Sequence, residues 1–230
     1  MLADYETLVQ NLVRDDANRL ALQDIDDAIA LALLRYSKDR PQTKVEDVTP
    51  TNTTTLPLPN AWEADFSALK SLEYPVGENP PEYIEPSRYS MYQDPTAITI
   101  KLIDAVDAAR DVRAAFTIAH VLDATHDTIP LADREAAACW AGALLCDQLA
   151  AFYSGGADST IQADSVRQQS KSQEYASRAK ALRKRYLDEL GVEEKTAVAA
   201  SSVAVVTPTD SRGQARITHS SEYRRSRTYQ

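Results

Sequence analysis

The chain has 230 residues, 43% of them hydrophobic and 26% charged, with a net charge of −9 and an isoelectric point of about 4.9. This composition is typical of a protein that folds around a sizeable core, and the acidic total argues against a dedicated nucleic-acid-binding protein, which is usually basic. The N-terminus lacks the pattern of a secretion signal, and no stretch approaches the ~18 apolar residues of a membrane span, so we expect a soluble protein made in the cytoplasm.

Two amphipathic helices are predicted in residues 1–41. The first covers residues 3–15, where five apolar side chains recur at helical spacing: Tyr5, Leu8, Val9, Leu12 and Val13. The second lies in LQDIDDAIALALLRYSKDRP, residues 22–41, and its expected apolar face comprises Leu22, Ile25, Ile29, Leu33 and Tyr36. Asp24 is expected to cap its N-terminus and Pro41 to end it.

Residues 42–121 are predicted to form a mostly β insertion between helical segments. Eight prolines fall in this region and disfavour helix. Five short runs predict the strands of one small antiparallel sheet: TKVEDVTP, TTTLPLP, YIEPSRYSMYQ, AITIKLID and VRAAFTIAHVL. Residues 60–75 predict one helical turn or a bulge, with four apolar side chains that dock the region on the rest: Trp62, Phe66, Leu69 and Leu72.

A second pair of helices is predicted in residues 122–191. The first, within residues 129–154, is rich in alanine, starts near Pro130 and stops before two adjacent glycines. The second begins near Ser159 and runs to Gly191, with an apolar stripe of Tyr175, Ala179, Leu182, Tyr186 and Leu190. Together with the N-terminal pair they predict an α+β fold: an antiparallel helical bundle that carries the β insertion.

The two cysteines, Cys139 and Cys146, lie seven residues apart in the alanine-rich helix. That spacing separates them by ~10 Å along the helix axis, which is too far for a disulfide. We therefore expect two buried free thiols, since free cysteine is among the most buried residue types.

An extended C-terminal tail is predicted for residues 192–230, because the apolar side chains there do not recur at helical spacing. Its last 20 residues hold five arginines and one glutamate, which leaves a net charge of −13 on the other 210 residues. The tail is either a disordered, solubilising end or a segment that becomes ordered on an acidic surface, with arginine forks and tyrosine anchors as contacts. The candidate contact residues are Arg212, Arg216, Tyr223, Arg224, Arg225, Arg227 and Tyr229.

One short segment, HVLDATHD, combines residue types that bind metals: His120, Asp123, His126 and Asp127. Aspartate and threonine are also common turn residues, and the segment lies between a predicted strand and a predicted helix. We interpret it as a turn, with a metal site that uses His120, Asp123 and His126 as the alternative. No motif for a nucleophile, a phosphate loop or a cofactor is recognised, so neither an enzyme activity nor a cofactor is expected.

Two stretches resemble the head-to-tail connector (adaptor) proteins of tailed bacteriophages. The first is DIDDAIALALLRYSKDRP, an opening helix that ends in an arginine-tyrosine-serine run. The second is REAAACWAGALLCDQLAAFYSGGADSTIQADSVRQQSKSQEYASRAKALRKRYLDELG, a small-residue helix, a glycine-containing turn and a polar helix that ends in Tyr-x-x-x-Leu-Gly. Together the stretches cover a little over a third of the chain.

The resemblance implies a ring, commonly of twelve copies, under the portal protein in the neck of the virion. The helical bundle would form the ring wall, and genome DNA would pass through the channel without specific binding. The arginine-rich tail would dock on the portal, and a downstream neck or tail protein would bind the ring; no membrane is involved.

The long segment at 42–121 departs from the smaller, mostly helical members, and we expect it to contact tail or neighbouring neck proteins. Two alternatives stay open: another neck or tail-completion protein of the tail-terminator type, or a small metal-dependent enzyme.

Overall fold

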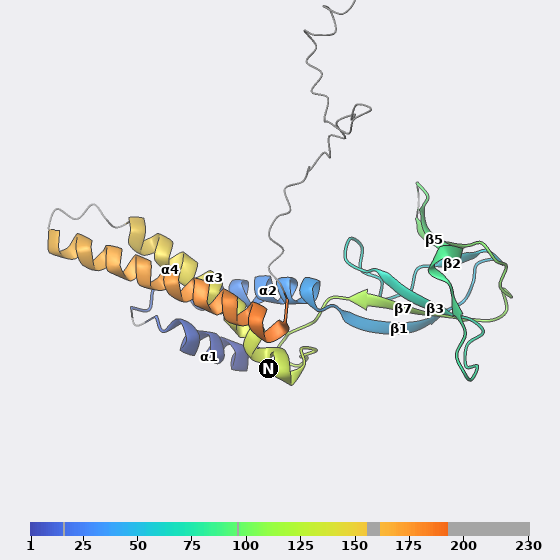
Figure 1. Cartoon of the computed structure of the whole chain (residues 1–230), viewed down its shortest axis with the longest axis horizontal. Coiled ribbons are helices and arrows are strands. Elements are labelled where there is room, and N and C mark those ends of the chain that lie inside the picture. The colour runs from blue at the N-terminus through green and yellow to red at the C-terminus, as the bar shows by residue number, and fades with distance from the viewer. Residues whose placement is uncertain (16, 96, 156–161, 193–230) are drawn as a thin grey trace, which may run out of the picture. The chain divides into compact units, whose positions relative to one another are not determined.

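The computed structural model describes residues 1–15, 17–95, 97–155 and 162–192. In this part of the chain, four α-helices and seven strands in two antiparallel sheets form an α+β fold, as the sequence predicts (Figure 1). All of these residues belong to one unit, Met1–Glu193. The predictions for residues 193–230, and the predicted helix start near Ser159, fall outside the described residues.

The N-terminal helices are α1, Leu2–Val13, and α2, Leu22–Asp39. In α1, Tyr5, Val9 and Val13 are buried, whereas Leu8 lies on the exposed side, contrary to prediction. In α2 the buried residues are Ile25, Ala28, Ile29, Ala32, Tyr36 and Ser37.

Two details predicted for the start of α2 are wrong. Leu22 is exposed rather than part of the apolar face, because in the first turn it points away from the rest of the fold. The N-cap is Ala21, not Asp24: the Asp24 carboxylate accepts the Ala21 backbone N–H at 2.8 Å from the third helical position. Asp24 therefore satisfies a backbone donor at the helix start, but from inside the first turn.

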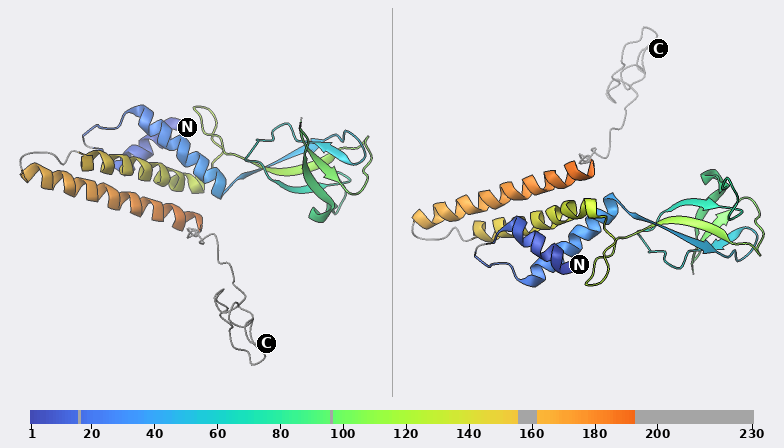
Figure 2. Two further views of the ribbon diagram at one scale, coloured as in Figure 1. Left: turned by 90° about the horizontal axis from the view of Figure 1, so that it is seen from above. Right: turned by 90° about the horizontal axis from the view of Figure 1, so that it is seen from below.

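The C-terminal helices are α3, Arg134–Gly155, and α4, Gln162–Leu190, and a 3₁₀ turn at Leu131–Asp133 leads into α3. Helix α3 packs against α4 on one side and against α1 and α2 on the other (Figure 2). The predicted stripe of α4 is confirmed: Ala179, Leu182, Tyr186 and Leu190 are buried, and Tyr175 is half-buried against the same core.

Helix α3 occupies the centre of the helical core. Its alanines, its glycine and its two cysteines are small enough for the other helices to approach closely. By length and composition alone, Leu131–Gly155 is long and apolar enough to cross a membrane. The expectation that no stretch of the sequence meets this criterion was therefore wrong. In the fold, 67% of its most apolar window is buried, because α1, α2 and α4 cover it.

The seven strands lie between α2 and α3 in the chain and form two sheets rather than the single sheet predicted. The first sheet has the order β1-β7-β3-β4, and its strands are β1 (Gln42–Val48), β7 (Val112–Ile118), β3 (Leu69–Glu73) and β4 (Tyr83–Ile84). The second has the order β2-β6-β5, and its strands are β2 (Thr55–Pro57), β6 (Ile98–Leu102) and β5 (Tyr89–Gln93).

A second hydrophobic core lies among these strands, separate from that of the helices. Its buried residues are Val48, Leu56, Leu72, Ile100, Leu102, Val106, Val112, Ala114 and Phe116. Strand β3 supplies Leu72 and was missed by the sequence analysis, which predicted a helical turn or a bulge there. The predicted turn and the predicted bulge both occur next to this strand. A turn at Glu63–Ser67 precedes it, and the register of its pairing with β7 shifts between Leu69 and Ser71.

Candidate assembly surface

The seven tail residues predicted to bind a partner lie outside the described residues: Arg212, Arg216, Tyr223, Arg224, Arg225, Arg227 and Tyr229. The candidate sites considered below therefore come from the helices, the strands and the loop that joins β7 to α3.

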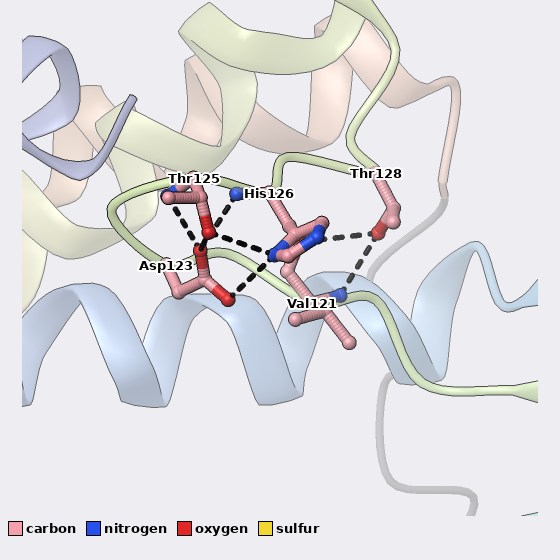
Figure 3. A network of polar contacts seen from close by, with 5 residues as sticks. All are labelled: Val121, Asp123, Thr125, His126 and Thr128. Atoms are coloured by element: carbon pink, nitrogen blue, oxygen red, sulfur yellow. Dashed lines mark hydrogen bonds and ion pairs between the residues drawn. The ribbon is translucent and has the colours of Figure 1, made fainter.

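The loop at 121–128 closes on itself through the Asp123 carboxylate (Figure 3). One oxygen of Asp123 accepts the backbone N–H groups of Thr125 and His126, each at 2.6 Å, and the other lies 3.1 Å from His126 Nδ1. These hydrogen bonds stabilise the ionised carboxylate and hold the pKa of Asp123 well below its usual range. The geometry is that of an aspartate turn, as the sequence analysis interpreted it.

His120 does not join Asp123 and His126. Its Nε2 lies 3.0 Å from the Arg40 carbonyl oxygen, and its Nδ1 lies 3.0 Å from both the carbonyl and hydroxyl oxygens of Thr128. The side chain is buried, and its ring packs on Tyr36 with centroids 4.9 Å apart. Both ring nitrogens therefore serve the fold, and the described residues contain no group of three or more His, Cys, Asp or Glu arranged to hold a metal ion.

A buried carboxylate, Asp133, joins three helices at one end of the helical core. It accepts hydrogen bonds from Tyr36 Oη at 2.6 Å and from Arg40 Nη1 at 2.9 Å, while Arg40 Nη2 donates to the Leu190 carbonyl oxygen at 3.0 Å. Burial and the hydrogen bond to Asp133 raise the pKa of Tyr36 above its usual value. The network fixes the C-terminal ends of α2 and α4 beside the start of α3.

Both cysteines are buried free thiols, as predicted. Burial raises the pKa of each thiol to about 11, because the apolar surroundings disfavour the thiolate. Neither thiol has the exposed, electropositive surroundings of a reactive cysteine.

Helix α2 carries an exposed stripe on the side opposite its buried residues. We call it the α2 face, and it consists of Asp27, Ala30, Leu31, Leu34 and Lys38. Leu31 and Leu34 are 56% and 54% exposed, although large apolar side chains are usually buried. The sequence did not indicate this face, because apolar periodicity identifies the side of a helix that faces the core.

Helix α4 carries a matching exposed stripe, also opposite its buried residues. We call it the α4 face, and it consists of Ser177, Lys180, Ala181, Lys184 and Asp188. The cations around it are paired within the chain: Arg183 with Asp147, and Arg185 with Glu135 and Glu189. Among the described residues, no ion pair engages Lys180, Lys184 or Asp188, nor Lys38 on the α2 face.

The second sheet also carries exposed large apolar side chains. Met91 and Tyr92 of the edge strand β5 are 44% and 50% exposed, and Ile98 on the neighbouring strand is 37% exposed. The ammonium of Lys101 lies over the Tyr92 ring, 5.7 Å from its centroid. An aromatic edge strand of this kind is suited to contact with another protein chain.

No protein-family model matches the chain, and no curated protein matches it at a significant level.

Proposed function

We propose that the chain is a structural head-to-tail connector of a tailed bacteriophage and has no enzymatic activity. Copies of it form a ring, of about twelve subunits, under the portal protein in the virion neck. The four helices are the antiparallel bundle of the ring wall, and residues 192–230 are an extended tail that docks on the portal. The protein is made in the cytoplasm of the host bacterium and joins capsid to tail.

The exposed α2 face is the observation that carries the proposal. Two leucines more than half exposed, side by side on a helix whose other side is well packed, are typical of a chain that buries this surface in an assembly. The resemblance to connector proteins covers α2, α3 and α4, three of the four helices that share the helical core. The alternative metal site gains no support from the described residues, because His120 bonds Arg40 and Thr128 and does not join Asp123 and His126.

The charge distribution supports the same function. An acidic body repels phosphate, so DNA would pass through a ring of such subunits without sticking to its wall. The arginines at 212–227 carry the opposite charge and suit an acidic docking surface on the portal. Many weak tail contacts on one ring would act together, which offsets the entropy of ordering each tail.

The strands suit a third contact, with a downstream neck or tail protein. Strand β5 forms the free edge of its sheet and exposes Met91 on one face and Tyr92 on the other. A partner strand added at this edge would gain backbone hydrogen bonds and an apolar surface.

Binding to the portal ring encoded in the same genome tests the proposal. Full-length protein and a version that ends at Glu194 are mixed with the portal, and the complexes are weighed by native mass spectrometry. We expect the full-length chain to load about one copy per portal subunit and the shortened chain to bind at least ~10-fold more weakly.

If the shortened chain binds as well as the full-length chain, the tail is not the anchor. If neither chain binds, the protein is not a portal connector, and a tail-terminator type of neck protein becomes the better assignment.

A further inference from the structure

We propose that the α2 face of one copy packs against the α4 face of the next copy, so that the subunits join head to tail. This inference deepens the proposed function and rests on the ring that it includes. The contact is heterologous, since it uses two different surfaces of the chain, and such contacts close into rings when the rotation between copies allows it.

The two faces point away from each other. Helix α3 lies between α2 and α4 along most of their length (Figure 2), and each face lies opposite the buried stripe of its own helix. The two helices approach only near their C-terminal ends, where Tyr186 Oη donates to Asp39 at 2.7 Å. A subunit therefore presents one face to the copy before it and the other to the copy after it.

The faces have the same residue spacing, and the helices that carry them end close together. Arg40 Nη2 donates to the Leu190 carbonyl oxygen near the C-terminal ends of α2 and α4, and both helices run toward that end. Counting back from Arg40 and Leu190 at ~1.5 Å per residue matches Leu31, Leu34 and Lys38 with three residues of the other face. Those residues are, in the same order, Ala181, Lys184 and Asp188.

The side chains at matching levels are complementary. In a ring whose axis runs along the helices, neighbouring copies stay level, so Lys38 meets Asp188 of the next copy. Leu31 meets the small side chain of Ala181, and Leu34 meets the aliphatic stem of Lys184. Asp27 lies about one turn of helix from the level of Lys180, within reach of a lysine side chain.

Cysteine cross-linking of the full-length chain tests this contact. Leu31→Cys and Ala181→Cys are made singly and together and oxidised with copper phenanthroline. The native thiols do not interfere, because both are buried. We expect a ladder of multimers from the double variant, dimers from a mixture of the two single variants, and no cross-link from either single variant alone. The pair Thr7→Cys with Ala181→Cys is the matched control, since Thr7 is exposed on α1 and belongs to neither face.

Charge reversal gives an independent readout. Lys38→Glu places a carboxylate opposite Asp188 and is expected to raise the protein concentration at half-assembly by at least ~10-fold. Adding Asp188→Lys restores an opposite-charge pair and should return that concentration to within ~3-fold of the starting value. Circular dichroism confirms that each variant is folded.

The outcomes separate this inference from the proposed function. Rings that form, or portal that is loaded, without the ladder overturn the α2–α4 contact and leave the connector function standing. Cross-links within Leu31→Cys alone show a symmetric dimer and also overturn it. A chain that neither assembles nor loads the portal overturns both.

Discussion

Asp133 holds together residues that are far apart in the chain. Its side chain is almost buried and bonds both Tyr36 and Arg40, which lie 97 and 93 positions away. If the buried Tyr36 hydroxyl loses its acceptor, the full desolvation energy of that group is no longer compensated. The Asp133 carboxylate also holds the Arg40 side chain in the position from which it donates to the Leu190 carbonyl oxygen at the end of α4. The stability of the helical core should therefore depend strongly on this residue.

Asp133→Ala is expected to lower the free energy of unfolding by about 2–3 kcal/mol. The cost is not larger because the Arg40 side chain is 46% exposed and regains water when its partner is removed. Urea unfolding followed by circular dichroism measures the change. Asp104→Ala is the matched control: Asp104 pairs with Arg88 at 2.8 Å, both are about half exposed, and the cost should stay under ~1 kcal/mol. Equal losses in the two variants would contradict the role assigned to Asp133.

Hydrogen bonds between residues that are far apart in the chain could not be predicted from the sequence. Nothing in the local pattern around Asp133 or His120 indicates their partners, because hydrogen bonds between distant segments leave no periodic signal. The Asp123 turn could be interpreted correctly because all of its partners lie within three residues.

At the scale of one element, helix α3 depends on the absence of a side chain at Gly142. A Cβ placed there would lie 3.3 Å from Leu182 Cδ1, 3.6 Å from Leu12 Cβ and 3.7 Å from Val13 Cγ2. The glycine thus lets α1 and α4 approach α3 at the same level. A Cβ alone would crowd only the end of the Leu182 side chain, but a long side chain would have to displace both neighbours.

Gly142→Leu is expected to lower the free energy of unfolding by about 2–3 kcal/mol, because four extra carbon atoms enter a filled space. Gly155→Leu at the end of the same helix is the control, since nothing lies within 4 Å of a Cβ at that site. We expect the control to change stability by less than ~1 kcal/mol. Thermal and urea unfolding of both variants provide the measurement, and an unaffected Gly142→Leu would refute the close packing at this position.

Helices were easier to predict than strands for a physical reason. Each helix repeats its apolar spacing over several turns, so α2 and α4 stand out despite single errors such as Leu22. Strand β3 has five residues, LKSLE, with one fully buried side chain. Its place is decided by pairing with β7, forty or more residues later in the chain. The division into two sheets likewise depends on pairings that the alternation of each strand does not specify.

At the scale of the whole described unit, two separate hydrophobic cores carry the fold. One is shared by the four helices and the other by the strands. Leu149 is 1% exposed in the first core and Leu72 is 0% exposed in the second. Because the two cores share no buried residue, a substitution in one core should first lower the local stability of the helices or strands that surround it.

Leu72→Ala and Leu149→Ala are each expected to cost about 2–5 kcal/mol, through the lost burial and the cavity left behind. Hydrogen exchange measured by mass spectrometry should show which elements lose stability in each variant. Leu72→Ala should speed exchange in β1, β3 and β7 while α3 stays protected, and Leu149→Ala should do the reverse. Exchange that rises equally in all elements for both variants would mean that the described unit unfolds as one.

The candidate assembly surface on α2 could not be predicted from the sequence. The α2 face is visible once the buried side of the helix is known, but the sequence alone assigned Leu22 and Leu33 to the core side and left Leu31 and Leu34 without a role. Two leucines three residues apart, such as Leu31 and Leu34, are compatible with either side of a helix. Which side of α2 is buried depends on how α3 packs against it.

The pairing of Gln42 with Ile118 has a consequence for how this chain can change over time. These residues are the first of β1 and the last of β7, so the polypeptide leaves the helices and returns to them at points only ~5 Å apart. A segment whose two ends are neighbours can be lengthened, exchanged or removed without rerouting the chain on either side. The helices that would build the ring and the strands that would meet a tail can therefore diverge at different rates, which would let one lineage keep its subunit contacts while adapting to a new tail.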